Sequence, residues 1–140
     1  MCASDVRLRV FLVEDSPVIR ENLVATLEEI ARVQVVGWAD EEGAARQWLE
    51  SADGGCDLVV VDIFLRRGSG LGLLDWLSEA QHPVRRVVLS NYASPDMRRR
   101  CLARGADAVF DKPDEVDALI EHCRLLADAA PGPGSPAGAS

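Results

Sequence analysis

The sequence predicts an α/β protein with a doubly wound, parallel sheet of five strands and five helices. Five short runs rich in apolar and β-branched residues alternate with longer segments of helical spacing. Strands that alternate with helices pair in parallel and are covered by helices on both faces. The chain has 140 residues, of which 48% are hydrophobic and 27% charged. This length and balance are typical of one globular domain with a full core.

The expected strands are the five apolar runs. They are LRVFLV (8–13), VQVVGWA (33–39), DLVVVD (57–62), RRVVLS (85–90) and DAVFD (107–111). Apolar residues at consecutive positions, rather than at alternate ones, indicate strands that are buried on both faces. This pattern favours the interior of a parallel sheet.

The helices are predicted from their start signals and apolar spacing. The first begins at Ser16-Pro17 and the fourth at Ser94-Pro95, since Ser is a good N-cap and Pro suits the first helical position. The fourth ends at Gly105, and the others run from about residue 40 to 52, from about 70, and from about 114. The inward-facing residues are expected to be Ile19, Leu23, Leu27 and Ile30; Ala44, Ala45, Trp48 and Leu49; Leu71, Leu74 and Leu77; and Val116, Leu119, Ile120, Cys123 and Ala127.

Composition limits the domain organisation and the classes of function. Residues 1–129 are expected to form the domain, and the Pro/Gly/Ser-rich residues 130–140 a disordered tail. The net charge of −8 argues against general nucleic-acid affinity. The four cysteines lack metal-ligand spacing, and we find neither a signal peptide nor an apolar run of membrane-spanning length. A reducing cytoplasm is therefore the expected location.

Polar residues gather where the predicted strands end. Glu14 and Asp15 follow the first strand, Asp62 ends the third, Ser90 ends the fourth, and Lys112 follows the fifth. In a doubly wound sheet the carboxyl ends of the strands form the functional crevice. Three carboxylates repel one another there unless a cation offsets them, and oxygen ligands suit Mg²⁺. An Asp carboxylate is also a possible nucleophile toward phosphorus.

Lys112 stands out because it is the single lysine beside fourteen arginines. A chain this rich in Arg would use Arg for general surface charge, so the lysine needs a local reason. One such reason is a phosphoryl group in transfer, because the compact ammonium of a lysine beside it would offset the charge on the phosphoryl oxygens.

These residues resemble the receiver domain of two-component response regulators, in its stand-alone, single-domain form. The matching segments are FLVEDS (11–16), VVVDIF (59–64), GSGLGLL (68–74), VVLSNYAS (87–94) and GADAVFDKP (105–113). The resemblance covers about residues 7–127. It implies a flavodoxin-like fold with strand order 2-1-3-4-5.

The resemblance also implies a role for each site residue. Asp62 would accept a phosphoryl group from the phosphohistidine of a sensor histidine kinase or a histidine phosphotransfer protein. Lys112 would contact that group, and the Ser90 hydroxyl would move to it as the switch. Mg²⁺ would be bound by Asp15, by Asp62 and by the backbone carbonyl of Phe64, with Glu14 acting largely through water.

The resemblance further implies a signalling phosphoacceptor that catalyses only its own phosphorylation and dephosphorylation, and not an enzyme acting on other substrates. The expected output is an unknown downstream protein that binds the face of the fourth helix, fifth strand and last helix. No DNA-binding domain and no membrane association are expected.

Departures from the family pattern leave alternatives open. Receivers commonly have Tyr or Phe three residues before the lysine, where this chain has Val109, and strand alternation puts Phe110 on the opposite face. The first alternative is therefore a pseudo-receiver, a binding module that works without phosphorylation. Phe64 and Tyr92 flank the expected phosphoryl site, and we hypothesise that their bulk hinders the hydrolytic water.

The second alternative is a phosphohydrolase of the haloacid-dehalogenase type. Such enzymes have a second acid two residues after the nucleophile. Phe64 occupies that position. The absence of a substrate cap also weighs against this enzyme.

Overall fold

The chain folds around a five-stranded parallel sheet with the strand order β2-β1-β3-β4-β5. The computed structural model describes residues 8–30, 33–51, 55–65, 67–91 and 94–129. The predicted fold class and strand order are confirmed. Residues 130–140, for which the sequence predicts a disordered tail, lie outside the described residues.

Strands and helices alternate along the whole described chain. The strands are β1 (Leu8–Val13), β2 (Val33–Ala39), β3 (Leu58–Val61), β4 (Arg85–Ser90) and β5 (Ala108–Asp111). The helices are α1 (Pro17–Ile30), α2 (Glu42–Glu50), α3 (Gly70–Glu79), α4 (Pro95–Ala103) and α5 (Lys112–Ala129). Among the described residues, none of these helices combines the length and apolar character needed to cross a bilayer.

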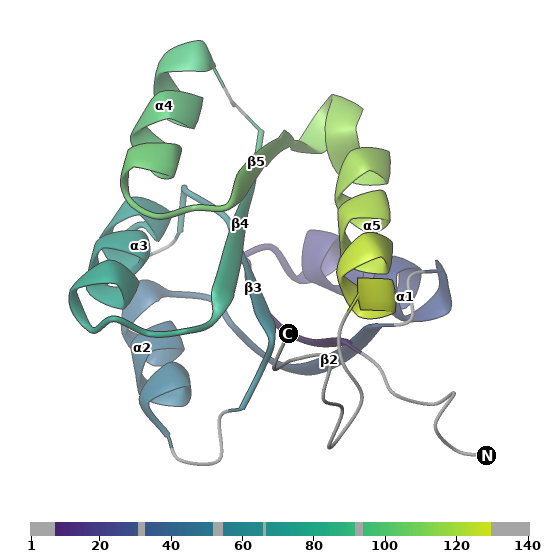
Figure 1. Cartoon of the computed structure of the whole chain (residues 1–140), viewed down its shortest axis with the longest axis horizontal. Coiled ribbons are helices and arrows are strands. Elements are labelled where there is room, and N and C mark those ends of the chain that lie inside the picture. Colours follow the sequence, from purple (N-terminus) through teal and green to yellow (C-terminus); the bar gives the residue numbers. More distant parts are fainter. Residues whose placement is uncertain (1–7, 31–32, 52–54, 66, 92–93, 130–140) are drawn as a thin grey trace.

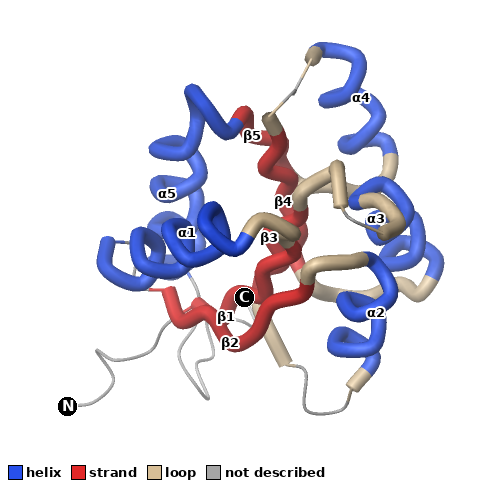
Figure 2. The backbone as a smooth tube through the Cα atoms, turned by 180° about the vertical axis from the view of Figure 1, so that it is seen from behind, coloured by secondary structure: helices blue, strands red, loops and turns tan. Residues whose placement is uncertain are grey.

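The sheet lies between two layers of helices. Helices α1 and α5 cover one face, and α2, α3 and α4 cover the other (Figures 1 and 2). In β1, Val10 and Leu12 face the α1–α5 layer, whereas Phe11 and Val13 pack on the opposite side. Both sets are buried. The central strands are therefore apolar at successive positions because both of their faces are core.

The helix starts follow the predicted caps, with local differences. The Ser94 hydroxyl accepts the Met97 N–H at 3.1 Å, as expected of an N-cap ahead of Pro95. Helix α5 begins at Lys112 rather than near Asp114, and its backbone is non-helical at Glu115.

The burial of two helical residues differs from the prediction. Ala44, predicted to face inward, is exposed, while Leu73 is fully buried although it was not predicted to be.

Candidate functional site

The site is built at the carboxyl ends of the two central strands. Strands β1 and β3 are neighbours, and the Asp62 N–H donates to the Val13 carbonyl at 3.0 Å. This bond continues the parallel ladder by one residue beyond β3. It brings the first residue after β3 beside the residues that follow β1.

Three carboxylates meet at this edge. One oxygen from each of Glu14, Asp15 and Asp62 lies within 4.8 Å of the others. Glu14 is 2% exposed and Asp62 is 6% exposed, so two of the three acids are taken almost entirely out of water. Buried acids in such proximity require compensation by positive charge and hydrogen bonds. Oxygen donors alone suit a hard cation such as Mg²⁺, so the donor set fits that ion.

Backbone groups hold two of these carboxylates in place. The Ser16 N–H donates to Glu14 Oε2 at 3.1 Å. The Phe64 N–H donates to Asp62 Oδ1 at 3.3 Å. Each acid is thus oriented by the amide two residues further along the chain, which limits the rotation of its side chain. The buried aspartate after an apolar strand is accordingly part of a fixed acidic cluster.

Ser90 ends β4, the strand that pairs with β3. Its side chain is fully buried, and the register pairs it with Asp111 of β5. The Val61–Val88 pairing places the ends of β3 and β4 at the same edge of the sheet. The predicted Lys112 lies at the start of α5, directly after β5, but its side chain falls outside the described part of the chain.

The two residues before Asp111 face opposite sides of the sheet, as the sequence predicts. Val109 is buried with Val88 and Cys101 on the side of α3 and α4. Phe110 packs on the α1–α5 side, where its ring meets His122 edge-on at 5.6 Å between centroids. The position three residues before Lys112 therefore carries the aliphatic side chain of Val109, and the ring of Phe110 lies on the other face of the sheet. Tyr92 lies outside the described residues, and Phe64 is 54% exposed.

Sequence inspection missed an arginine beside the acidic edge. Arg20 of α1 donates from Nη1 to the Glu14 carbonyl at 3.2 Å and lies 3.6 Å above the centre of the Trp38 ring. Trp38 is 52% exposed. In the sequence, residues 19–21 look like an ordinary turn of an amphipathic helix. The contact between Arg20 and Trp38 depends on the proximity of α1 to the end of β2, which only the structure shows.

A model of the response regulator receiver domain family matches residues 10–124. This segment contains the acidic cluster, Ser90 and all five strands except the start of β1. The chain belongs to this family. Its members are signalling domains of two-component systems.

Curated relatives agree with this assignment. The chain is 34% identical over 125 residues to the "Probable transcriptional regulatory protein" of Picosynechococcus, covering 86% of this chain and 49% of the relative. It is 33% identical over 138 residues to a protein-glutamate methylesterase/protein-glutamine glutaminase of Anaeromyxobacter dehalogenans, covering 92% of this chain and 37% of the relative. The chain thus spans less than half of each of these relatives.

Solved structures show the same fold. The Francisella response regulator 1452 receiver domain superposes with a TM-score of 0.77 at 22% identity, covering 86% of this chain and 96% of that one. The response regulator domain of Thermotoga maritima CheB gives 0.74 at 22% identity, covering 89% and 99%. A Burkholderia pseudomallei response regulator, solved with a phosphorylated aspartic acid, calcium ion and citrate, gives 0.70 at 24% identity, covering 86% and 69%.

Proposed function

We propose that this receiver accepts a phosphoryl group on Asp62 from the phosphohistidine of a sensor histidine kinase or histidine phosphotransfer protein. The observation that carries the proposal is the cluster of Glu14, Asp15 and Asp62, whose carboxylate oxygens lie within 4.8 Å at the edge of the sheet. The phosphorylated aspartic acid and calcium ion of the Burkholderia pseudomallei regulator support the same chemistry on the same fold.

In the transfer, an oxygen of the Asp62 carboxylate attacks phosphorus. An O–P bond forms as the P–N bond to the donor imidazole breaks, and the electron pair of that bond stays on the nitrogen. The Phe64 N–H orients the nucleophile through its 3.3 Å bond to Asp62 Oδ1. The low exposure of Asp62, 6%, limits competing water.

Asp15, Asp62 and the Phe64 carbonyl would hold Mg²⁺, with Glu14 acting largely through water. The ion would supply positive charge that offsets the carboxylates and the phosphoryl oxygens. We propose that Lys112 contacts the phosphoryl group. Ser90 is the proposed hydroxyl switch, and the face of α4, β5 and α5 is the proposed binding surface for a downstream protein, in the cytoplasm.

The test is the intact mass of the protein after incubation with acetyl phosphate and Mg²⁺. Addition of one phosphoryl group, lost in Asp62→Asn and in the presence of EDTA, is the expected result. Circular dichroism of Asp62→Asn controls for its folding. No addition to a folded protein, either from acetyl phosphate or from phosphohistidine donors, would contradict the proposal. It would instead favour the pseudo-receiver, for which the aliphatic Val109 at the usual aromatic position is the supporting observation.

Phe64 offers a second test of the same site. Phe64 is 54% exposed and lies two residues after the proposed phosphoacceptor, where its bulk would obstruct the hydrolytic water. We expect Phe64→Asn to lose its phosphoryl group faster than the wild type. The rate is measured as the decay of the phosphorylated mass after removal of acetyl phosphate, and an unchanged rate would contradict the steric explanation.

A further inference from the structure

The segment between β3 and α3 is closed on itself directly after Asp62. Phe64 and Ser69 form an isolated antiparallel bridge, and the Gly70 N–H donates to the Ile63 carbonyl at 2.9 Å. The Ser69 hydroxyl then caps α3 by accepting the Gly72 N–H at 3.1 Å. The backbone of Phe64 is therefore positioned by Ser69, through the pairing across this closed segment.

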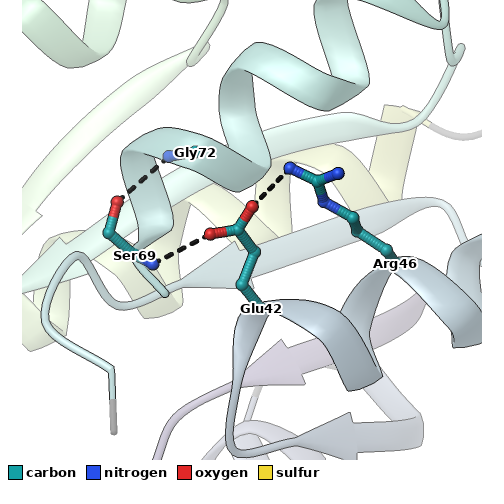
Figure 3. A network of polar contacts seen from close by, with 4 residues as sticks. All are labelled: Glu42, Arg46, Ser69 and Gly72. Atoms are coloured by element: carbon teal, nitrogen blue, oxygen red, sulfur yellow. Dashed lines mark hydrogen bonds and ion pairs between the residues drawn. The ribbon is translucent and has the colours of Figure 1, made fainter. Parts of the chain in front are cut away.

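Ser69 is itself held by a residue of another helix. Glu42, the first residue of α2, accepts the Ser69 N–H on Oε1 at 3.0 Å and donates its own N–H to the Arg67 carbonyl at 3.0 Å. Its second carboxylate oxygen pairs with Arg46 one turn along α2. Figure 3 shows the carboxylate between Arg46 and Ser69, with the capping bond to Gly72 beside it.

The segment is shaped to receive this side chain. Gly68 has a positive φ of 77°, and a Cβ added there would lie 2.5 Å from the Cβ of Glu42. Only glycine combines that conformation with that approach. The Glu42 side chain is 17% exposed, so this contact is largely shielded from solvent. Two backbone hydrogen bonds and a close steric fit together fix the segment against α2.

We propose that Glu42 is a positioning residue for the cation site. This inference rests on the proposed function, in which the Phe64 carbonyl is a ligand of Mg²⁺. Glu42 fixes Ser69, Ser69 pairs with Phe64, and Phe64 also orients Asp62 through its N–H. Glu42 therefore acts on two proposed ligands without touching the ion. A ligand that is held in place before binding loses less conformational freedom when the ion binds.

The test is the Mg²⁺ affinity of the unphosphorylated protein, measured by isothermal titration calorimetry well below the unfolding temperature. We expect Glu42→Ala to raise the dissociation constant about tenfold, at the lower end of effects reported for removing outer partners of metal ligands. Glu41→Ala is the matched control. It removes the same charge from the adjacent N-cap residue, whose side chain makes no capping hydrogen bond, and its affinity should match that of the wild type.

Two conservative variants separate positioning from charge. Glu42→Gln keeps an oxygen at the right reach for the Ser69 N–H and should bind Mg²⁺ nearly as well as the wild type. Glu42→Asp keeps the charge but is one methylene shorter, so it should be as weak as Glu42→Ala. This pair also serves if Glu42→Ala does not fold, since both changes are small.

The outcomes distinguish the inference from the function on which it rests. Wild-type affinity for Mg²⁺ in Glu42→Asp, or a tenfold loss of affinity in Glu42→Gln, would overturn the positioning role and leave the proposed function standing. A fall in the melting temperature of Glu42→Ala without a change in its Mg²⁺ affinity would also overturn the positioning role. Absence of Mg²⁺ binding by the wild type would overturn the metal site, and this inference with it.

Discussion

Two glutamates on different helices, Glu42 of α2 and Glu115 of α5, make nearly the same set of contacts. Glu42 accepts a backbone N–H from Ser69 at 3.0 Å, and Glu115 accepts one from Asp111 at 2.9 Å. Each also pairs with an arginine. Each therefore secures a segment that leads into or out of the site.

The two differ in what the arginine connects. Arg46 belongs to the same helix as Glu42, one turn away, and the side chains of Arg46 and Glu42 are 41% and 17% exposed. Arg98 belongs to α4, whereas Glu115 belongs to α5. Their atoms lie 2.6 Å apart, and the side chains are 35% and 37% exposed. Arg98 also donates to the Val109 carbonyl of β5 at 3.0 Å. The Glu115 contact thus ties together α4, β5 and α5.

This difference indicates which contact is suited to change during signalling. The Glu42 side chain is shielded from solvent and positions the proposed metal site, where movement would lower the affinity for the ion. The Glu115 contact is solvent-accessible, and exposed ion pairs contribute little to stability, so a small free energy is enough to break it. It also lies on the proposed output face. The following predictions test this contrast, from the largest expected effect to the smallest.

Gly70→Ala should cause the largest loss of stability. A Cβ at this position would lie 2.4 Å from the Asp62 carbonyl oxygen and 2.9 Å from the Ile63 Cα. Backbone atoms cannot move aside as a flexible side chain can, so we expect a loss of about 3 kcal/mol, at the upper end for overpacking a core. Urea unfolding of the wild type and variant measures it. A loss well below 1 kcal/mol would show that the segment is less rigid than the contrast requires.

Glu42→Ala should follow, with a loss of about 1–2 kcal/mol, the cost of leaving a shielded hydrogen-bonding group without its partner. The Ser69 N–H and the Arg46 guanidinium both lose an acceptor in this variant. Glu115→Ala should cost less, because the Glu115 side chain is 37% exposed whereas that of Glu42 is 17% exposed. Urea unfolding of both variants in one buffer gives the comparison. Equal losses, or a larger loss for Glu115→Ala, would break the contrast between the two glutamates.

The fold was predictable because its signals are local. Strand boundaries follow from apolar runs, and the starts of α1 and α4 follow from Ser-Pro pairs within a few residues. The positions of Glu14, Asp15, Asp62 and Ser90 at one edge follow from the rule that parallel strands present their carboxyl ends together. The acidic cluster was therefore predictable once the strands were assigned.

The contacts of the two glutamates were not predictable, because their partners are distant in sequence. Glu42 and Ser69 are 27 residues apart, and Arg98 and Glu115 are 17 apart. In the sequence, Glu42 looks like an ordinary acid in the first turn of a helix. The burial of Leu73 was mispredicted for a similar reason, because it too depends on segments distant in sequence. Helical periodicity predicts only one apolar stripe per helix. Leu73 is buried beside that stripe, since α3 packs against β strands and α2 at once.

Phosphorylation should affect the two contacts differently. Hydrogen exchange at Asp111, whose N–H is bonded to Glu115, should become faster on phosphorylation as the output face rearranges. Exchange at Ser69 should stay unchanged or slow, because the site around it becomes more ordered. Exchange followed by mass spectrometry, with and without acetyl phosphate and Mg²⁺, measures both, and Asp62→Asn is the control. Faster exchange at Ser69 alone would reverse the assignment of fixed and changing contacts.

The smallest effect is expected in the pH dependence of stability. The hydrogen bond from Arg98, with that from the Asp111 N–H, lowers the pKa of Glu115 below its ordinary value of 4.5. A carboxyl group whose pKa is lower in the folded state stabilises that state fully above its unfolded pKa, and this contribution is lost as the pH falls through the folded value. The difference in urea midpoint between the wild type and Glu115→Gln should thus be constant from pH 7 to about 5 and should shrink below about 4.5.

Arg98→Gln should remove most of this pH dependence, because Arg98 is the main cause of the lowered pKa of Glu115. The Asp111 N–H would remain as the second and smaller cause. Two results would show that Arg98 does not pair with Glu115 in solution. The first is a midpoint difference that persists unchanged to pH 3. The second is a pH dependence of that difference that is the same in the Arg98→Gln background. The face formed by α4, β5 and α5 would then lack the solvent-accessible ion pair that distinguishes it from the segment held by Glu42.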